Sequence, residues 1–199
     1  MIDNLELIKQ LLNFEKKGDF YMLYILKRKK DQPEGERDNH QSVRTIKTYC
    51  ISSIDHLDSR YSEIVDLCEM FKARAYIHVQ KQNHDDVSLN MMVQLAQRIQ
   101  DGNTNQKGLF DSVVGQIKTL EKRWVVDIDT KDIHTLRNIQ IAINNCKPEG
   151  PKTKYIIPTK NGYHLITDRF DIKTFSKISP WIDVHKKNPT LLYYPNSLD

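Results

Sequence analysis

The sequence predicts an α+β fold, in which a mixed sheet is flanked by helices and two lobes pack closely together. Short apolar runs typical of strands and segments of helical periodicity follow one another without the strict alternation of a doubly wound parallel sheet. The chain has 199 residues, of which 39% are hydrophobic and 28% are charged, with only 7 glycines and 7 prolines. This length and composition are typical of one globular domain and exclude fibrous and disordered chains.

Residues 1–120 are expected to form an N-terminal α/β lobe. Its apolar patterns predict strands at 20–26, 43–51 and 74–79, and helices that start near residues 3, 57, 85 and 109 and end near residues 18, 68, 101 and 120. In the third helix we expect an inward face made of Val87, Met91, Leu95 and Ile99. The polar stretch from Lys27 to Gln41 contains Pro33 and Gly35, which predicts a mobile loop.

Residues 121–199 are expected to form a second lobe with more strand than helix. The predicted strands are 124–128, 154–158, 163–167, 182–184 and 191–194, and the predicted helices are about 132–146 and 171–177. No internal repeat or low-complexity linker separates the halves, so residues 1–199 are expected to be a single domain with lobes at about 1–120 and 121–199.

The composition limits the cellular compartment and the kinds of partner that we expect for this protein. The three cysteines form no C-x-x-C pair, which disfavours a disulfide framework and a four-cysteine zinc site. The longest apolar run, Phe20 to Leu26, is too short to span a bilayer, and the chain start lacks the pattern of a secretion signal, so we expect a cytoplasmic protein without a membrane partner. The net charge of +4 comes from residues 121–199, which suggests an anionic partner such as nucleic acid.

The sharpest motif is the apolar strand Trp124 to Ile128, because two carboxylates, Asp127 and Asp129, lie two positions apart at its end. Side chains two apart on a strand share a face, roughly 6.5–7 Å from one another. This arrangement suits one or two Mg²⁺ or Mn²⁺ ions, which prefer oxygen ligands. In the plainer interpretation, Asp129 starts a turn and Asp127 makes an ordinary polar contact.

Two later segments add candidate residues. In the segment from Pro158 to Ile166, an Asn-Gly turn leads into a strand, and Thr159, Lys160 and His164 could contact a triphosphate; an ordinary hairpin with a structural histidine is the alternative. A further apolar run leads to Asp183, and His185 shares its face. Several basic side chains near these motifs could follow a template backbone: Lys152, Lys154, Arg169, Lys173, Lys177, Lys186 and Lys187.

The order of the three motifs resembles the archaeo-eukaryotic primase superfamily, the primase-polymerases. The resemblance covers Trp124 to the C-terminus and includes the final segment from Leu191 to Leu198. It implies a minimal primase-polymerase-like core whose catalytic lobe begins at about residue 121, with Asp127, Asp129 and Asp183 as catalytic residues and ligands of Mg²⁺ or Mn²⁺. It also implies that His164 contacts the incoming nucleoside triphosphate, and the residue types of Lys160 and Thr159 make them further candidates for nucleotide binding.

This resemblance implies nucleotidyl transfer from a nucleoside triphosphate to a 3′-hydroxyl on a single-stranded nucleic-acid template, in the service of DNA replication and alongside a helicase or other replication protein. The sequence departs from the family pattern in two places. Gly162 stands where the family usually has serine two residues before the histidine, and Tyr193, Tyr194 and Asn196 stand where an arginine is usual.

Three other functions remain open on the sequence. A catalytically inactive nucleic-acid-binding accessory protein of a replicon would keep the fold and lose the reaction. A haloacid-dehalogenase-type phosphatase also has a strand ending in D-x-D, but Lys131 occupies the position where that pattern has threonine. A metal-dependent nuclease would use similar carboxylates with water in place of the 3′-hydroxyl.

Overall fold

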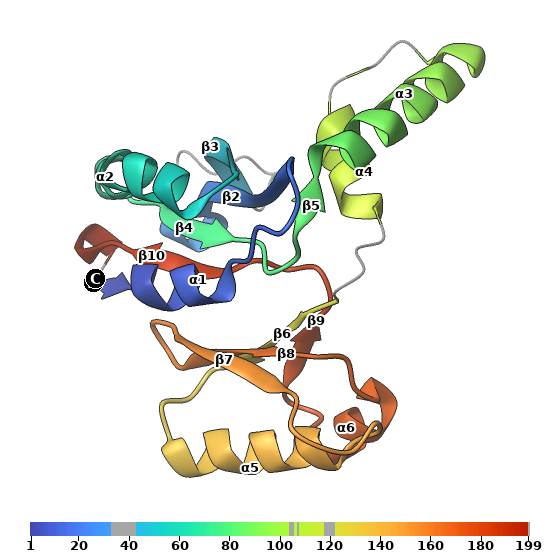
Figure 1. Ribbon diagram of the computed structural model, residues 1–199. Helices are drawn as coiled ribbons and strands as arrows, with labels where there is room; N and C mark the ends of the chain where they lie inside the picture. The colour runs from blue at the N-terminus through green and yellow to red at the C-terminus, as the bar shows by residue number, and fades with distance from the viewer. Residues whose placement is uncertain (33–42, 104–105, 107, 118–121, 199) are drawn as a thin grey trace.

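The computed structural model describes residues 1–32, 43–103, 106, 108–117 and 122–198. In these ranges two antiparallel sheets lie between helices, and the layers run in the order helix, sheet, sheet, helix (Figure 1). The predicted α+β class is confirmed, whereas the predicted mixed sheet is wrong: the described strands form two separate sheets with antiparallel pairing. β2 pairs with β3, and β7 with β8, in antiparallel register, as consecutive strands joined by a short connection must when they are neighbours in a sheet.

The first sheet has the strand order β1-β10-β4-β2-β3, and β5 pairs with the start of β2. Its strands are β1 (Ile2–Asp3), β2 (Asp19–Arg28), β3 (Val43–Ile51), β4 (Arg74–Ile77), β5 (Gln82–Asn83) and β10 (Thr190–Tyr194). The predictions for β2, β3, β4 and β10 are confirmed, while the two-residue strands β1 and β5 were not expected. Lys27 and Arg28 of the predicted loop belong to β2, Lys29–Asp31 form a 3₁₀ turn, and residues 33–41 lie outside the described residues.

Alternation along β2 gives the first sheet two apolar faces. Tyr21, Leu23 and Ile25 share a core with buried residues of α2 (Ile54–Phe71), and α1 (Leu5–Leu11) joins the same core. Phe20 and Met22 point to the other face, where they pack under α3 (His84–Gln100) and α4 (Leu109–Gln116). Both faces of β2 are therefore covered at its start.

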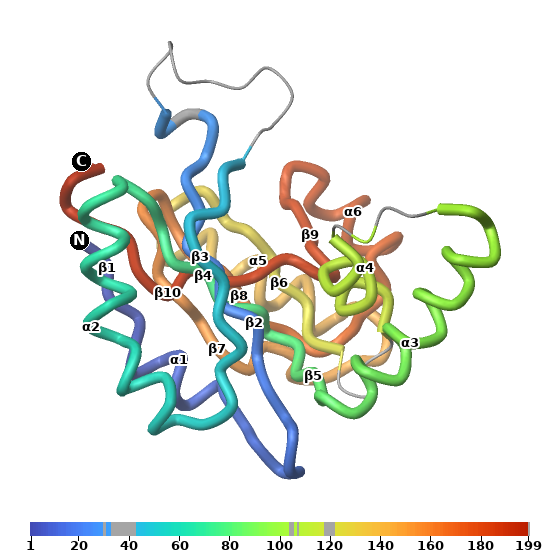
Figure 2. The backbone as a smooth tube through the Cα atoms, turned by 90° about the horizontal axis from the view of Figure 1, so that it is seen from above, coloured from blue at the N-terminus to red at the C-terminus, as the bar shows by residue number. Residues whose placement is uncertain are grey.

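The helix α3 projects away from the body of the molecule, as two views show (Figures 1 and 2). Val87 at its start is buried, and Met91 and Leu95 are partly buried against the same core. Ile99 is 65% exposed, so its predicted inward position is wrong. The reason is that the helix extends beyond the surface on which its first turns pack. None of the helices in the described ranges is long and apolar enough to cross a membrane.

The second sheet has the order β7-β8-β6-β9, made of β6 (Trp124–Ile128), β7 (Thr153–Pro158), β8 (Tyr163–Thr167) and β9 (Asp183–His185). The helices α5 (Ile133–Asn145) and α6 (Ile172–Ile178) cover one face, where Trp124, Val126 and Ile128 are buried. Val125 is buried in the core of the first sheet instead. Because side chains alternate along a strand, Asp127 lies on the same face as Val125, and its side chain points toward the first sheet.

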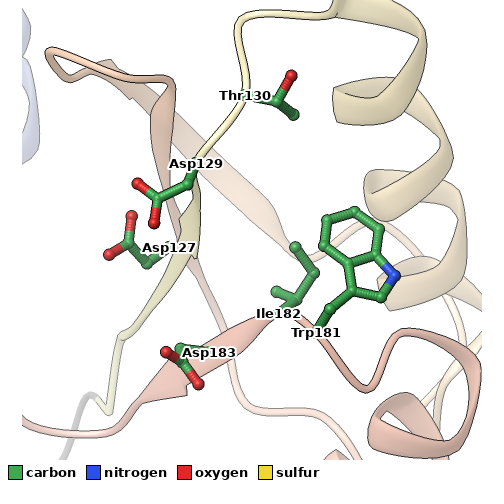
Figure 3. Close-up of a pocket in the computed structure, with 6 residues that line it drawn as sticks. All are labelled: Asp127, Asp129, Thr130, Trp181, Ile182 and Asp183. Atoms are coloured by element: carbon green, nitrogen blue, oxygen red, sulfur yellow. The ribbon is translucent and has the colours of Figure 1, made fainter.

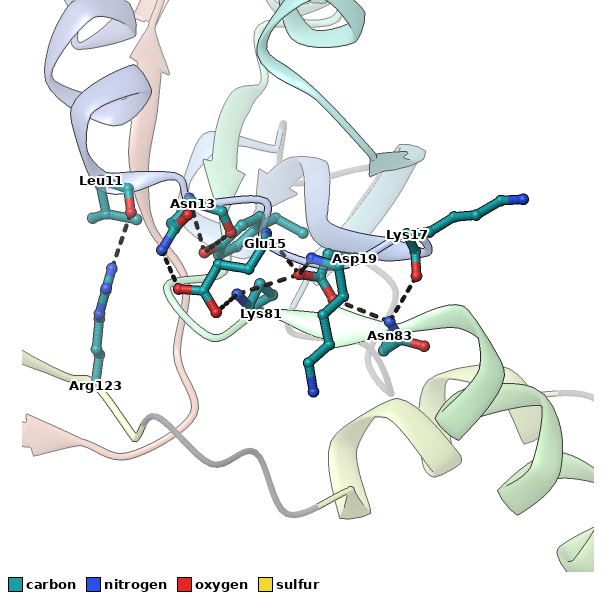
Figure 4. Close-up of polar contacts among 10 residues, drawn as sticks. Leu11, Asn13, Glu15, Lys17, Asp19, Lys81, Asn83 and Arg123 are labelled. Carbon is teal, nitrogen blue, oxygen red and sulfur yellow. Dashed lines mark hydrogen bonds and ion pairs between the residues drawn. The ribbon is translucent and has the colours of Figure 1, made fainter.

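Polar contacts tie the two sheets together at several points. The Arg123 guanidinium, just before β6, donates a hydrogen bond to the Leu11 carbonyl at 3.0 Å (Figure 4). Before the other end of α1, the buried side-chain amide of Asn4 donates to the carbonyls of Pro158 and Leu191, both at 3.0 Å. Near the start of β2, a separate set of bonds converges on Asp19 from Asn83, Lys81 and two backbone amides (Figure 4). The Arg123 and Asn4 bonds fix the relative position of the facing sheets, whereas the Asp19 bonds lie within the first sheet and its connections.

Candidate carboxylate site between two sheets

Asp127 is the centre of a row of polar side chains across the second sheet. It pairs in register with His164 on β8 and with Asp183 on β9. Side chains directly opposite each other on antiparallel strands have Cβ atoms about 4.5–5.5 Å apart. Asp129 follows two residues later, and the Asp127 and Asp129 carboxylates lie next to one another (Figure 3). The fold therefore brings together four side chains from three separate sequence motifs.

His164 is held in place by both sheets. Its Nδ1 atom lies 3.0 Å from Thr190 Oγ1 on β10, and its Nε2 atom lies 3.5 Å from the nearer Asp127 carboxylate oxygen. Burial lowers the pKa of His164 to about 4, and the positive charges of His185 and Arg28 act in the same direction. The ring is therefore neutral near pH 7.

The three carboxylates differ in their surroundings. Asp127 is about one-third exposed, while Asp129 and Asp183 are exposed. Burial raises the pKa of Asp127, and the negative charges of Asp129 and Asp183 raise it further; the positive charges of His185 and Arg28 oppose them. The site concentrates negative charge that a bound cation would compensate.

Gly162 allows the β7–β8 hairpin to approach the end of β6 closely. A Cβ atom at this position would lie 1.9 Å from the Ile128 carbonyl oxygen and 2.6 Å from the Thr130 nitrogen. Both neighbours are backbone atoms, so no side chain can be accommodated without separating the two segments. Gly162 thus has a packing role beside the carboxylates.

The hairpin's other candidate residues are already engaged within the protein. Thr159 Oγ1 accepts a hydrogen bond from the Gly162 amide at 3.1 Å. The Lys160 ammonium donates to the Tyr194 hydroxyl at 2.7 Å. Both side chains remain at the wall of a cavity that also includes His164, so a ligand there would compete for these bonds or add to them.

That cavity, of about 160 Å³, lies between the two sheets and will be called the basic cavity. The second sheet contributes Asp127, Asp129, His164 and the hairpin, and the first sheet contributes four side chains that sequence reasoning missed: Arg28, Arg74, Tyr76 and Tyr194. Arg74 is buried, pairs with Asp31 at 2.7 Å and lies 4.9 Å from the centre of the Tyr194 ring. An arginine at the start of an otherwise apolar strand was the available signal.

A second, smaller cavity of about 100 Å³ lies against the same carboxylates and will be called the tryptophan cavity (Figure 3). Its lining shares Asp127 and Asp129 with the basic cavity and adds Thr130, Trp181, Ile182 and Asp183. Trp181 forms the side of this cavity away from the Asp127 and Asp129 carboxylates, which point in the other direction (Figure 3).

The donor set fits a hard divalent cation in its chemistry, because carboxylate oxygens are the preferred ligands of Mg²⁺ and Mn²⁺. In the side-chain positions of the described ranges, however, no group of three His, Cys, Asp or Glu residues converges closely enough to hold a metal ion. Asp129 and Asp183 are exposed, and exposed side chains change rotamer readily.

Not every basic residue near the motifs faces the site. Lys152 is 4% exposed, and its ammonium donates to the carbonyls of Ile143 and Asn144 at the end of α5 and of Gly150 after the helix. Its predicted position along a template is therefore wrong; the carbonyls that end a helix need donors, and this buried lysine supplies them. Lys173 and Lys177 lie on α6, which covers the face of the second sheet opposite the carboxylates.

Comparisons with known proteins identify no relative of this chain. No protein-family model matches it, and neither a curated protein nor a solved structure gives a match.

Proposed function

We propose that the protein is a nucleotidyltransferase of the primase or primase-polymerase type, which transfers a nucleotidyl group from a nucleoside triphosphate to a 3′-hydroxyl on a nucleic-acid template. One observation carries the proposal: the Asp127 row faces Arg28 and Arg74 of the other sheet across the basic cavity. Carboxylates supply cation ligands, and the facing guanidinium groups suit the anionic phosphates of the substrate.

In this proposal each side chain has a distinct part. Asp127, Asp129 and Asp183 would hold Mg²⁺ or Mn²⁺, which supplies Lewis-acid chemistry and neutralises phosphate charge. The neutral His164 ring, oriented by Thr190, donates one hydrogen bond to a phosphate oxygen. Lys160 and Arg28 line the basic cavity, where their charges offset those of the triphosphate.

The reaction exchanges a phosphoanhydride bond for a phosphoester bond. The 3′-oxygen forms a bond to the α-phosphorus, the bond from that phosphorus to the bridging oxygen breaks, and pyrophosphate leaves with the bonding electrons. The hydroxyl proton passes to water. The proposed partners are accordingly nucleoside triphosphates and single-stranded template, with a helicase or other replication protein nearby in the cytoplasm.

The test is nucleotide incorporation on primed and unprimed single-stranded templates with Mg²⁺ or Mn²⁺ and labelled ribo- or deoxyribonucleotides. Product from the wild type that Asp127→Ala and Asp129→Ala fail to make would support the proposal. Asp168→Asn is the matched control, because this carboxylate pairs with Lys154 and is not part of either cavity. Equal product from the wild type and both alanine variants would refute the assigned carboxylates.

A catalytically inactive nucleic-acid-binding protein is the second candidate. It is favoured by the open arrangement of the carboxylates in the described ranges and by the engagement of Thr159 and Lys160 in internal hydrogen bonds. Binding of single-stranded template without product under every metal and nucleotide condition would select this function.

A further inference from the structure

The helix α3 carries apolar residues on two faces. On the inner face, Val87 is buried, and Met91 and Leu95 are partly buried against the core that α4 shares. The Gln94 amide donates a hydrogen bond to the Gln116 side chain of α4 at 3.1 Å and ties the two helices together. Residues three, four and seven apart share a face of a helix. The second apolar face will be called the outer stripe, and it consists of Leu89, Met92, Val93, Ala96 and Ile99.

The outer stripe is exposed along its whole length. The exposed fractions are 59%, 64%, 70% and 65% for Leu89, Met92, Val93 and Ile99, and Ala96 is exposed as well. Single apolar residues scattered over a surface are normal, but a contiguous apolar stripe marks an interaction site. Because α3 projects away from the body, a partner can reach this side of the helix (Figures 1 and 2).

The middle of α3 is uncharged. The segment from Val87 to Gln97 contains no charged residue, although 28% of the whole chain is charged. The polar residues beside the outer stripe include Ser88 and Asn90, whose hydroxyl and amide groups both donate and accept hydrogen bonds. Depletion of charge and the presence of methionine are typical of the centre of a protein–protein interface. A charged polymer such as nucleic acid finds no opposite charge here.

The spacing of the outer stripe is symmetrical. Leu89, Met92, Ala96 and Ile99 follow one another at intervals of 3, 4 and 3 residues, which is the spacing of a coiled-coil seam. The intervals are the same in the reverse direction, so an antiparallel copy of the helix places Leu89 opposite Ile99 and Met92 opposite Ala96. A large side chain then faces a small one, which allows the two helices to interdigitate. The stripe is therefore complementary to itself.

An antiparallel pair also keeps the two bodies apart. The N-terminal end of α3 is attached to the body through the buried Val87, and the helix projects from there (Figures 1 and 2). In an antiparallel pair the body of each copy lies at the opposite end of the two helices, whereas a parallel pair would bring both bodies to the same end. Because both copies use the same face, the contact is complete with two chains.

We propose that the outer stripe binds the same stripe of a second copy of this chain, with the two α3 helices antiparallel, and that the protein forms a twofold-symmetric dimer through this contact. The 17 residues of α3 span about 25 Å. A pair of helices of this length buries less area than a standard interface of about 1,600 Å². The dimer should therefore dissociate with a Kd of about 1–100 μM.

Sedimentation equilibrium of the full chain between about 2 and 200 μM should show an equilibrium of monomer and dimer. Met92→Glu places a charge in the outer stripe and should weaken dimerisation at least about tenfold. Met70→Glu is the matched control, because Met70 is 73% exposed near the end of α2 and lies outside the stripe. Glutamate is a good helix former, so both variants should keep the circular dichroism spectrum of the wild type.

Disulfide cross-linking tests the orientation of the pair. An equimolar mixture of Leu89→Cys and Ile99→Cys proteins should form a covalent dimer on oxidation, because the antiparallel arrangement places these positions opposite each other. Ile99→Cys alone should not, because the two copies of residue 99 lie about 15 Å apart along the pair. The wild type contains three free cysteines and is the control for cross-links through them.

The outcomes decide between a dimer through α3 and other arrangements. Loss of the dimer in Met92→Glu and its retention in Met70→Glu, together with the mixed cross-link, would support the proposal. A wild type that stays monomeric over the whole concentration range would overturn it, as would a dimer that Met92→Glu leaves unchanged. Efficient cross-linking of Ile99→Cys with itself would contradict the antiparallel pair.

Discussion

Replacing Gly162 by alanine tests whether the close contact between the hairpin and β6 positions the site. The added Cβ atom would fall 1.9 Å from the Ile128 carbonyl oxygen and within 2.7 Å of the Thr130 carbonyl oxygen. Overpacking costs about 1–3 kcal/mol, and contact with two backbone segments places this change at the upper end. For a chain of this size, a loss of about 3 kcal/mol lowers the Tm by about 6–12 °C.

Thermal unfolding followed by circular dichroism measures the effect, and Gly115→Ala is the matched control. Gly115 lies within α4, and a Cβ atom there meets nothing within 4 Å. The control should therefore be neutral or stabilise by up to about 1 kcal/mol, because alanine favours helix. A Gly162→Ala protein that unfolds at the wild-type temperature would refute the packing role assigned to this glycine.

Two further predictions concern buried groups. Burial lowers the pKa of His78 to about 4. Below about pH 6.5 the unfolded chain therefore binds a proton at this side chain that the folded chain does not bind. The free energy of unfolding should have its full value above that pH and be about 2 kcal/mol lower at pH 5. Between pH 7.5 and 5, the free energy of unfolding measured with urea should depend less on pH in His78→Gln than in the control His134→Gln. Equal pH dependence in the two variants would contradict the lowered pKa of His78. Lys152→Met should cost about 2–3 kcal/mol because three carbonyls lose their donor, against less than about 1 kcal/mol for Lys154→Met, whose partner Asp168 is exposed. Equal urea midpoints for the two lysine variants would remove the structural role of Lys152.

Elements with strong local patterns were predictable. The strands β6 and β8 have the predicted bounds, because each is a short, mostly apolar run bounded by polar or turn residues. Alternation along β8 also explains why Leu165 is buried under the helices while His164 lines the basic cavity. The two-residue strands β1 and β5 are too short to carry a periodic signal and depend on long-range pairing.

What the sequence could not predict depends on contacts between distant segments. Candidate carboxylates were recognisable from Asp127 and Asp129 alone, but the facing wall of Arg28 and Arg74 comes from strands about 50 to 100 residues earlier in the chain. Basic charge near a motif in sequence also says little about orientation, as the buried Lys152 shows. A periodic apolar face predicts that one side of a helix packs, but not how far along the helix the packing extends. For this reason the exposure of Ile99, near the end of α3, was not predictable.

Manganese binding tests the central claim most directly, because it reads the carboxylates without knowledge of the template or nucleotide. Titration of Mn²⁺ followed by electron paramagnetic resonance should detect binding to the wild type and to Asp168→Asn. Binding should be at least about tenfold weaker in Asp127→Asn, since removal of one charged ligand costs more than about 1.4 kcal/mol. Identical Mn²⁺ binding by the wild type and Asp127→Asn, or none by the wild type, would contradict the proposed carboxylate site.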